Sequence, residues 1–243
     1  MTSHCSCHTP SFQAKPQHLF EMFLFINPLD TQCLQLEKEL LQFIQESSQQ
    51  VYFRLIAFMD YPLFHQSLNR QTNHSLKEAN ALFQSIYKLC LGYKAALCQG
   101  QKRGRLFLMT MQKVFNEDHH HPFSYETMAD CATLCGLDVN MWEEDYHSGK
   151  AKSDFQEDIH LIKQMNITSY PSLVVYDNLN YRYGVKLQGA FTSNDLEELI
   201  EQMMPQSDTL HLYCPNQKTS ANKEGSKIPP HHSLTSTSLL RHS

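Results

Sequence analysis

The chain has 243 residues, of which 41% are hydrophobic and 19% charged, with a formal net charge of -5. This length supports one substantial hydrophobic core with an insertion or a tail. The acidic balance, without a compensating lysine and arginine cluster, argues against nucleic acid as a partner. No stretch reaches the ~20 apolar residues of a membrane span, and residues 1–17 lack the apolar centre of a secretory signal. We therefore expect a cytoplasmic protein that binds neither nucleic acid nor a membrane.

Composition divides the chain into three parts. A His- and Cys-rich segment covers residues 1–18, and alternating and helical apolar patterns fill residues 19–204. Residues 205–243 are rich in Ser, Thr, Asn, Lys, His and Pro, and contain few apolar residues. Such a segment cannot bury enough surface to offset the entropy of ordering, so we expect a largely disordered tail.

The first segment contains a compact group of potential metal ligands, His4, Cys5, Cys7 and His8. Thiolates and imidazoles are ligands that zinc prefers. Neighbouring residues rarely surround one tetrahedral ion on their own, since structural sites usually draw on a second group of ligands. Zinc binding, completed by a further ligand, and a terminal segment without metal are both open interpretations.

The apolar run over residues 19–26 predicts a buried strand, and apolar residues at helical spacing predict a helix over Asp30–Glu46. The β-branched and aromatic residues of Gln50–Phe58 predict a second strand, parallel to the first. These three elements form a right-handed β-α-β unit.

The junction between the first strand and its helix keeps the spacing of a C-x-x-C motif as Asp30-Thr31-Gln32-Cys33. A helix N-terminus stabilises a thiolate or a carboxylate, and here Asp30 occupies the position of the attacking thiol. Asp30 is also a favourable N-cap. Cys33 falls one turn inside the helix, where we expect it to be more buried and its pKa to be less depressed.

From about residue 72 to residue 166 the pattern is helical and predicts an inserted helical subdomain. Two features within it could be metal ligands: Cys131 with Cys135, four residues apart, and the run His119-His120-His121. Buried cysteines usually pack in cores, and histidines before Pro122 fit a solvated loop. We expect core packing and a loop, respectively.

The last part of the domain predicts a hairpin and a closing helix. Ser172–Tyr176 and Tyr181–Leu187 read as antiparallel strands around the turn at residues 177–180. A helix capped by Thr192 or Ser193 then runs to Met203 and ends at Pro205.

The complete order, β-α-β, helices and β-β-α, resembles an α/β thioredoxin-like fold with a DsbA-type helical insertion. In that fold a cis-proline precedes the third strand and faces the C-x-x-C helix, and Pro171 stands at this position. Asp30, Cys33, Tyr170 and Pro171 are therefore the candidate frame of a degenerate active site and the candidate lining of a groove for a partner.

Several short motifs together resemble the ClpXP adaptor SpxH family, also called YjbH, over roughly residues 4–204. They are the His/Cys cluster, Asn27-Pro28-Leu29 followed by Cys33, residues 95–100, Gly136-Leu137-Asp138, and residues 155–158 leading into Tyr170-Pro171.

This resemblance implies a cytosolic adaptor without catalytic activity of its own. It would bind the transcriptional regulator Spx and promote its degradation by the Clp protease ClpXP, in response to oxidative stress. It also implies zinc at the N-terminal cluster. Two departures are evident: Asp30 replaces the first cysteine of members with C-x-x-C, and the tail after residue 205 lacks the amphipathic helices of some members.

Two alternatives remain. One is a DsbA-like enzyme, either a monothiol oxidoreductase or a glutathione-dependent isomerase, that uses Cys33; in the second case Asp30 would repel the glutathione thiolate. The other, compatible with an adaptor, is a redox sensor in which oxidation of Cys5 and Cys7 releases zinc.

Overall fold

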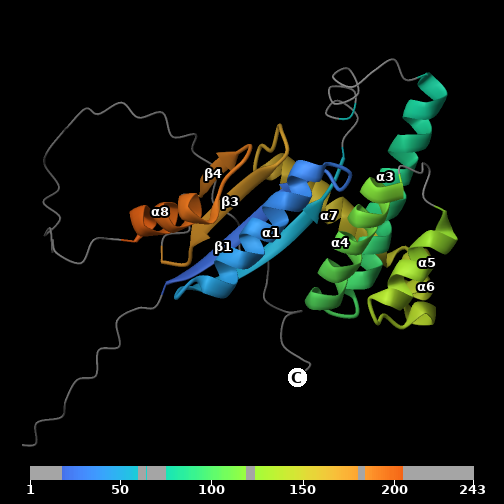
Figure 1. The fold of residues 1–243 in the computed structure, drawn as a ribbon, viewed down its shortest axis with the longest axis horizontal. Helices are drawn as coiled ribbons and strands as arrows, with labels where there is room; N and C mark the ends of the chain where they lie inside the picture. The colour runs from blue at the N-terminus through green and yellow to red at the C-terminus, as the bar shows by residue number, and fades with distance from the viewer. Residues whose placement is uncertain (1–17, 60–63, 65–74, 119–123, 180–183, 205–243) are drawn as a thin grey trace, which may run out of the picture.

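The computed structural model describes residues 18–59, 64, 75–118, 124–179 and 184–204. A four-stranded sheet with the order β2-β1-β3-β4 lies at its centre (Figure 1). The strands are β1 (Leu19–Ile26), β2 (Gln50–Ala57), β3 (Ser172–Asp177) and β4 (Val185–Gln188).

Strand β1 is the central strand and has buried side chains on both faces, as its continuous apolar run predicts. It pairs in parallel with β2 and antiparallel with β3, so that Leu24 lies between Leu55 and Leu173. Strand β3 pairs antiparallel with β4. The predicted parallel unit and hairpin are confirmed, although β4 runs over Val185–Gln188 and residues 180–183 lie outside the described part.

Helices cover both faces of the sheet. On one face, α1 (Thr31–Glu46) and α8 (Ser193–Met203) pack against Met22 and Leu24 through a shared apolar cluster. The C-terminal half of α7 (Lys150–Gln164) covers the other face and packs against Phe23 and Phe25. The sheet is therefore the middle layer of three.

The insertion contains α3 (Leu76–Leu97), α4 (Gln101–Asp118), α5 (Tyr125–Leu134), α6 (Val139–His147) and the start of α7. Its helices begin at sequence-encoded caps, including a Ser75 capping box with Glu78 and the side chains of Ser124 and Asp138. Its core is built around the fully buried Trp142, whose indole nitrogen donates a 2.9 Å hydrogen bond to the carbonyl of Gly92.

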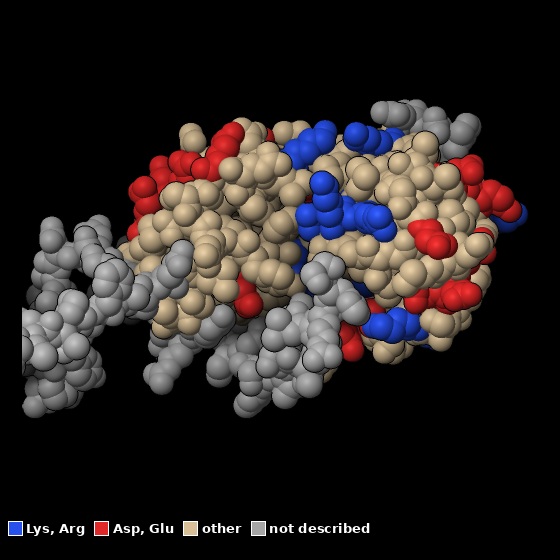
Figure 2. Space-filling model, turned by 90° about the horizontal axis from the view of Figure 1, so that it is seen from below, with Lys and Arg blue, Asp and Glu red and all other residues tan. Residues whose placement is uncertain are grey.

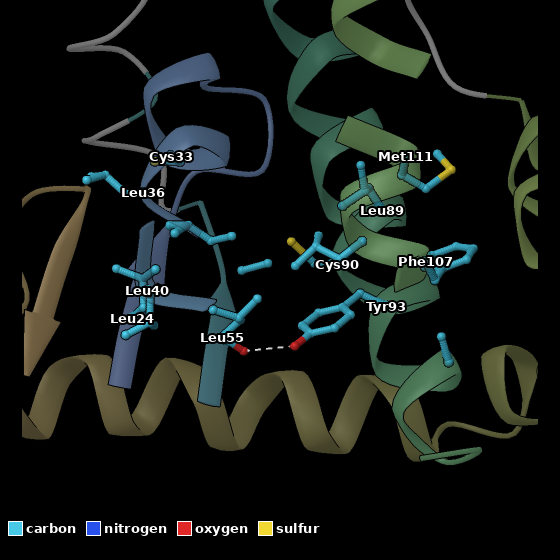
Figure 3. Close-up of a cluster of buried hydrophobic side chains, with 14 of the residues drawn as sticks. Leu24, Cys33, Leu36, Leu40, Leu55, Leu89, Cys90, Tyr93, Phe107 and Met111 are labelled. Carbon is cyan, nitrogen blue, oxygen red and sulfur yellow. Dashed lines mark hydrogen bonds between the residues drawn. The ribbon is translucent and has the colours of Figure 1, made fainter. Parts of the chain in front are cut away.

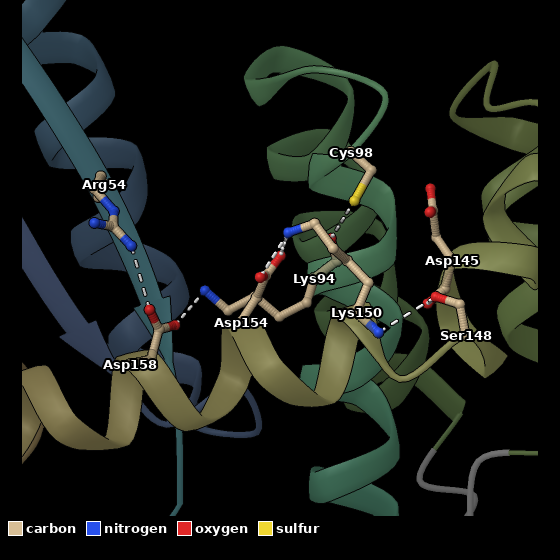
Figure 4. A network of polar contacts seen from close by, with 8 residues as sticks. All are labelled: Arg54, Lys94, Cys98, Asp145, Ser148, Lys150, Asp154 and Asp158. Atoms are coloured by element: carbon tan, nitrogen blue, oxygen red, sulfur yellow. Dashed lines mark hydrogen bonds and ion pairs between the residues drawn. The ribbon is translucent and has the colours of Figure 1, made fainter. Parts of the chain in front are cut away.

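The insertion meets β2 through a polar junction, the β2–α3–α7 seam, formed by Arg54, Lys94 and Asp158. Asp158 is 1% exposed, and its carboxylate forms an ion pair with the ammonium of Lys94 on α3 and a 3.3 Å contact with the guanidinium of Arg54 on β2 (Figure 4). Two cations thus face one buried carboxylate, which joins three elements that are far apart in the sequence.

A second junction, the α1–α4 seam, consists of Glu37 and Gln112, both 0% exposed. The amide nitrogen of Gln112 donates a 2.6 Å hydrogen bond to Oε1 of Glu37. The other carboxylate oxygen of Glu37 and the amide oxygen of Gln112 have no partner among the described residues. Burial raises the pKa of Glu37 to about 8, although the Gln112 hydrogen bond and the charge of Lys38 act in the opposite direction.

Candidate functional site

A tight turn joins β1 to α1. The amide of Asp30 donates a 3.1 Å hydrogen bond to the carbonyl of Asn27, and the side-chain oxygen of Asn27 accepts a 3.0 Å hydrogen bond from the amide of Leu29. The carboxylate of Asp30 accepts a 2.8 Å hydrogen bond from the amide of Gln32. Asp30 is therefore the N-cap of α1, as predicted, and its carboxylate is used by the first turn of the helix.

Cys33 lies below this turn, in the core. It is 0% exposed and belongs to the apolar cluster that includes Leu24, Leu36 and Leu40 (Figure 3). Burial raises the pKa of its thiol well above the ordinary value, and the charge of Asp30 adds to this rise. The expected burial is confirmed, and the group stays a neutral thiol without access to solvent.

The peptide bond between Tyr170 and Pro171 is cis, as predicted. Pro171 is buried, and its carbonyl accepts a 3.0 Å hydrogen bond from the amide of Gly189 after β4. The hydroxyl of Ser172 donates a 2.7 Å hydrogen bond to the carbonyl of Ser169. The loop before β3 is thus fixed by one hydrogen bond to the residue after β4 and by another within the loop itself.

The register of the sheet brings this loop to the junction. Ser172, the first residue of β3, pairs with Phe25 of β1. Pro171, one residue earlier, therefore lies at the level of Ile26, where β1 ends and the turn to Asp30 begins. The ring of Tyr170 packs edge-on against Phe58 with centroids 6.2 Å apart, and its hydroxyl lies 3.7 Å from the sulfur of Met59.

The structure therefore gathers Asp30, Cys33, Tyr170 and Pro171 at one end of the sheet. The sequence singles out Asn27 as part of the junction motif, but no local pattern places Met59 at this end. An asparagine that directly follows a buried strand and precedes Pro28 is a signal for a side-chain-closed turn, which Asn27 forms here.

The predicted metal ligands His4, Cys5, Cys7 and His8 lie outside the described residues, as do His119-His120-His121. Within the described ranges, no group of three or more His, Cys, Asp or Glu side chains is arranged to hold a metal ion. Cys131 and Cys135 are buried in the core of the insertion, as expected.

None of the helices in the part of the chain that the structure describes is both long and apolar enough to cross a bilayer. This finding agrees with the sequence, in which polar and charged residues interrupt each helical run.

Comparison with known proteins identifies relatives of this chain. A family model described as thioredoxin matches residues 23–198. Proteins named ClpXP adapter protein SpxH are similar in sequence: one from Bacillus cereus is 26% identical over 80% of this chain and 72% of its own length. The SpxH protein of Bacillus subtilis is 24% identical over 87% of this chain and 76% of its own. The SpxH protein of Staphylococcus haemolyticus is 26% identical over 78% of this chain and 67% of its own length.

Solved structures agree on the fold. A candidate protein disulfide isomerase of Nitrosomonas europaea superimposes with a TM-score of 0.60 at 15% identity, covering 77% of this chain and 97% of its own. The oxidoreductase DsbA of Xylella fastidiosa superimposes with a TM-score of 0.51 at 11% identity, covering 76% and 83%. The chain therefore belongs to the thioredoxin family, has the DsbA-like fold with a helical insertion, and is related in sequence to the SpxH adapter proteins.

Proposed function

We propose that this protein is a cytoplasmic adaptor that binds an Spx-like transcriptional regulator and promotes its degradation by ClpXP. The observation that supports this role best is the state of the C-x-x-C position. Asp30 stands where the attacking thiol would be and caps the helix, while Cys33 is fully buried. The catalytic frame keeps its shape and offers no exposed thiolate for exchange.

Loss of the thiol leaves a binding surface intact. Hydrogen bonds fix the Pro171 loop, and the Asp30 turn is closed by its own side chains. Two rigid neighbouring loops lose little conformational entropy when a protein binds. In the proposal, this end of the sheet contacts the client.

The buried thiol also weighs against the alternative of a monothiol or glutathione-dependent enzyme. Cys33 would have to reach solvent and ionise, and its burial and the charge of Asp30 oppose both steps. Cys33→Ser is expected to leave client degradation unchanged.

The proposal also includes zinc bound by the N-terminal cluster of His4, Cys5, Cys7 and His8, as a link to oxidative stress. Oxidation of the two thiolates would remove ligands and release the metal. Metal analysis of the purified chain before and after peroxide, with a Cys5→Ser/Cys7→Ser variant as control, tests this part.

The adaptor role is tested by reconstitution of purified ClpXP with an Spx-like regulator. Addition of this protein should shorten the half-life of the regulator several-fold, whereas a ClpXP substrate that needs no adaptor should be degraded at an unchanged rate. An unaltered half-life of the regulator would contradict the proposal.

A further inference from the structure

Strand β2 forms one edge of the sheet, and half of that edge is uncovered among the described residues. The amide of Phe58 donates a 3.1 Å hydrogen bond to the carbonyl of Ile26 on β1. Because the backbone groups of successive residues in a strand point in opposite directions, those of Val51, Phe53 and Leu55 point away from β1. The hydroxyl of Tyr93 donates a 3.1 Å hydrogen bond to the carbonyl of Leu55 (Figure 3). No described residue outside the sheet forms a hydrogen bond with the backbone of Val51 or Phe53.

Three basic residues lie at the start of α4, next to the region of β2: Lys102, Arg103 and Arg105. The guanidinium of Arg105 lies 4.6 Å above the centre of the Phe53 ring, which places this part of α4 directly beside β2. Lys102 and Arg103 are exposed, and none of the three forms an ion pair with a described carboxylate. Figure 2 shows lysine and arginine side chains gathered in the middle of a face between two regions with acidic side chains.

These charges do not stabilise their own helix. Cations in the first turn oppose the helix dipole, and the first turn of α4 contains no acidic residue. Their position is also fixed, because Gly104 packs so closely on α3 that a Cβ there would lie 2.6 Å from a methyl carbon of Leu97. A partner with the opposite charge is the simplest physical reason to gather cations at this place.

We propose that the outward edge of β2 over Gln50–Phe53, together with Lys102, Arg103 and Arg105, binds an extended acidic segment of a partner protein. The segment adds a strand to the sheet through the outward backbone groups of Val51 and Phe53, and its carboxylates pair with cations at the start of α4. Because β1 and β2 are parallel, Gln50 lies at the opposite end of the sheet from the Asp30 and Pro171 loops. This surface is separate from the one in the proposed function.

Other occupants fit less well. The C-terminal segment of the chain is itself basic, with Lys218, Lys223, Lys227 and Arg241 against Asp208 and Glu224. A second copy would offer the acidic residues of α8, among them the exposed Glu197, Glu198 and Glu201, but these lie on a helix that cannot extend a sheet. An acidic segment from another protein supplies both the charge and the extended backbone.

The test uses a fluorescent ten-residue peptide of alternating Glu and Thr, with fluorescence anisotropy on the full chain at low and moderate salt. The wild-type protein should bind this probe, more weakly as salt rises. Lys102→Glu/Arg103→Glu should weaken binding at least tenfold. The control Lys152→Glu/Lys163→Glu changes the same charge at exposed positions of α7 and should shift affinity less than twofold.

Val51→Pro tests the edge itself. Proline removes only an outward amide and is tolerated on an edge strand, so the sheet should stay intact by circular dichroism while probe binding weakens several-fold. An equal loss in both charge variants, or full binding by Val51→Pro, would overturn the proposal. Self-association of the wild type that disappears in Lys102→Glu/Arg103→Glu would overturn it in favour of a second copy.

Discussion

The two polar seams between the thioredoxin layers and the insertion each bury a carboxyl group, but they pair it with different partners. In the β2–α3–α7 seam, one buried carboxylate faces two cations from two other elements. In the α1–α4 seam, a buried carboxyl faces a neutral amide, and one oxygen on each side chain lacks a described partner. The first seam is held by opposite charges and the second by a group that is most stable without its charge.

This difference has a physical consequence. A buried ion pair contributes little net stability against an apolar alternative, but removal of one partner leaves an uncompensated charge. A buried carboxyl beside an amide instead retains its proton, so its effect on the free energy of unfolding depends on pH. Burial also raises the pKa of Asp158, and Lys94 and Arg54 oppose that rise, so the charged seam should depend most on its two cations. The neutral seam should depend most on pH.

The largest effect is expected from Lys94→Met, which leaves Asp158 buried with only the more distant Arg54. The free energy of unfolding should fall by about 3–5 kcal/mol in urea denaturation. Lys150→Met is the matched control, since it removes the same ammonium from the exposed Lys150–Asp154 pair, with an expected loss below about 1 kcal/mol. Equal losses in the two variants would show that burial does not set the strength of the seam.

Glu37→Gln should stabilise the protein near neutral pH. The folded state holds the Glu37 proton up to a pKa of about 8, whereas the unfolded chain releases it near 4.5, so the wild type loses stability as pH rises from 4.5 to 8. At pH 7 this loss is on the order of 3 kcal/mol, because each pKa unit corresponds to about 1.4 kcal/mol.

Urea denaturation at pH 5 and pH 7 measures this effect. The difference between Glu37→Gln and the wild type should grow with pH, whereas Glu46→Gln, at an exposed position of the same helix, should show no such trend. A difference that is independent of pH would contradict the assigned protonation.

A smaller effect is expected where α1 begins. Asp30→Ala removes the acceptor for the amide of Gln32 and should cost about 1 kcal/mol of unfolding free energy. Asp30→Asn keeps an acceptor oxygen and should lose only a fraction of this. Thermal unfolding of the three proteins makes the comparison, and an equal loss in both variants would assign the effect to charge rather than to capping.

The smallest perturbation is alkylation, which compares Cys33 of the thioredoxin layers with Cys90 and Cys98 of the insertion. Cys98, at the end of α3, is exposed, whereas Cys33 and Cys90 are buried. Brief treatment with iodoacetamide, followed by peptide mass spectrometry, should label Cys98 and leave the other two unmodified. All three should react in urea, and rapid labelling of Cys33 in the folded protein would revive a catalytic role for it.

Most of the fold could be predicted because local signals and tertiary structure agree. The apolar run of β1 and the caps Asp30 and Thr192 each fix one feature without knowledge of the rest, whereas the cis geometry at Pro171 was expected only from the match to a known fold. The position of Pro171 beside the α1 junction followed from the match to a known fold, since no local pattern specifies which strands become neighbours.

The seams could not be predicted in the same way. Glu37 and Gln112 are 75 positions apart, and both residue types usually face water. One signal was present, because Glu37 follows Cys33 by four residues and precedes Leu40 by three, and so lies on the apolar face of α1. The proximity of Arg105 to Phe53 depends on how the insertion docks, which the sequence does not encode locally.

The single tryptophan is placed where it can report on one half of the molecule alone. Trp142 lies in the core of the insertion between the rings of Phe107 and Tyr146, and the thioredoxin layers contain no other indole. Intrinsic fluorescence therefore follows the insertion, while far-ultraviolet circular dichroism follows the whole chain. Two coincident unfolding curves would mean that the halves melt as one unit, and an earlier fluorescence transition would mean that the insertion can open while the sheet stays folded.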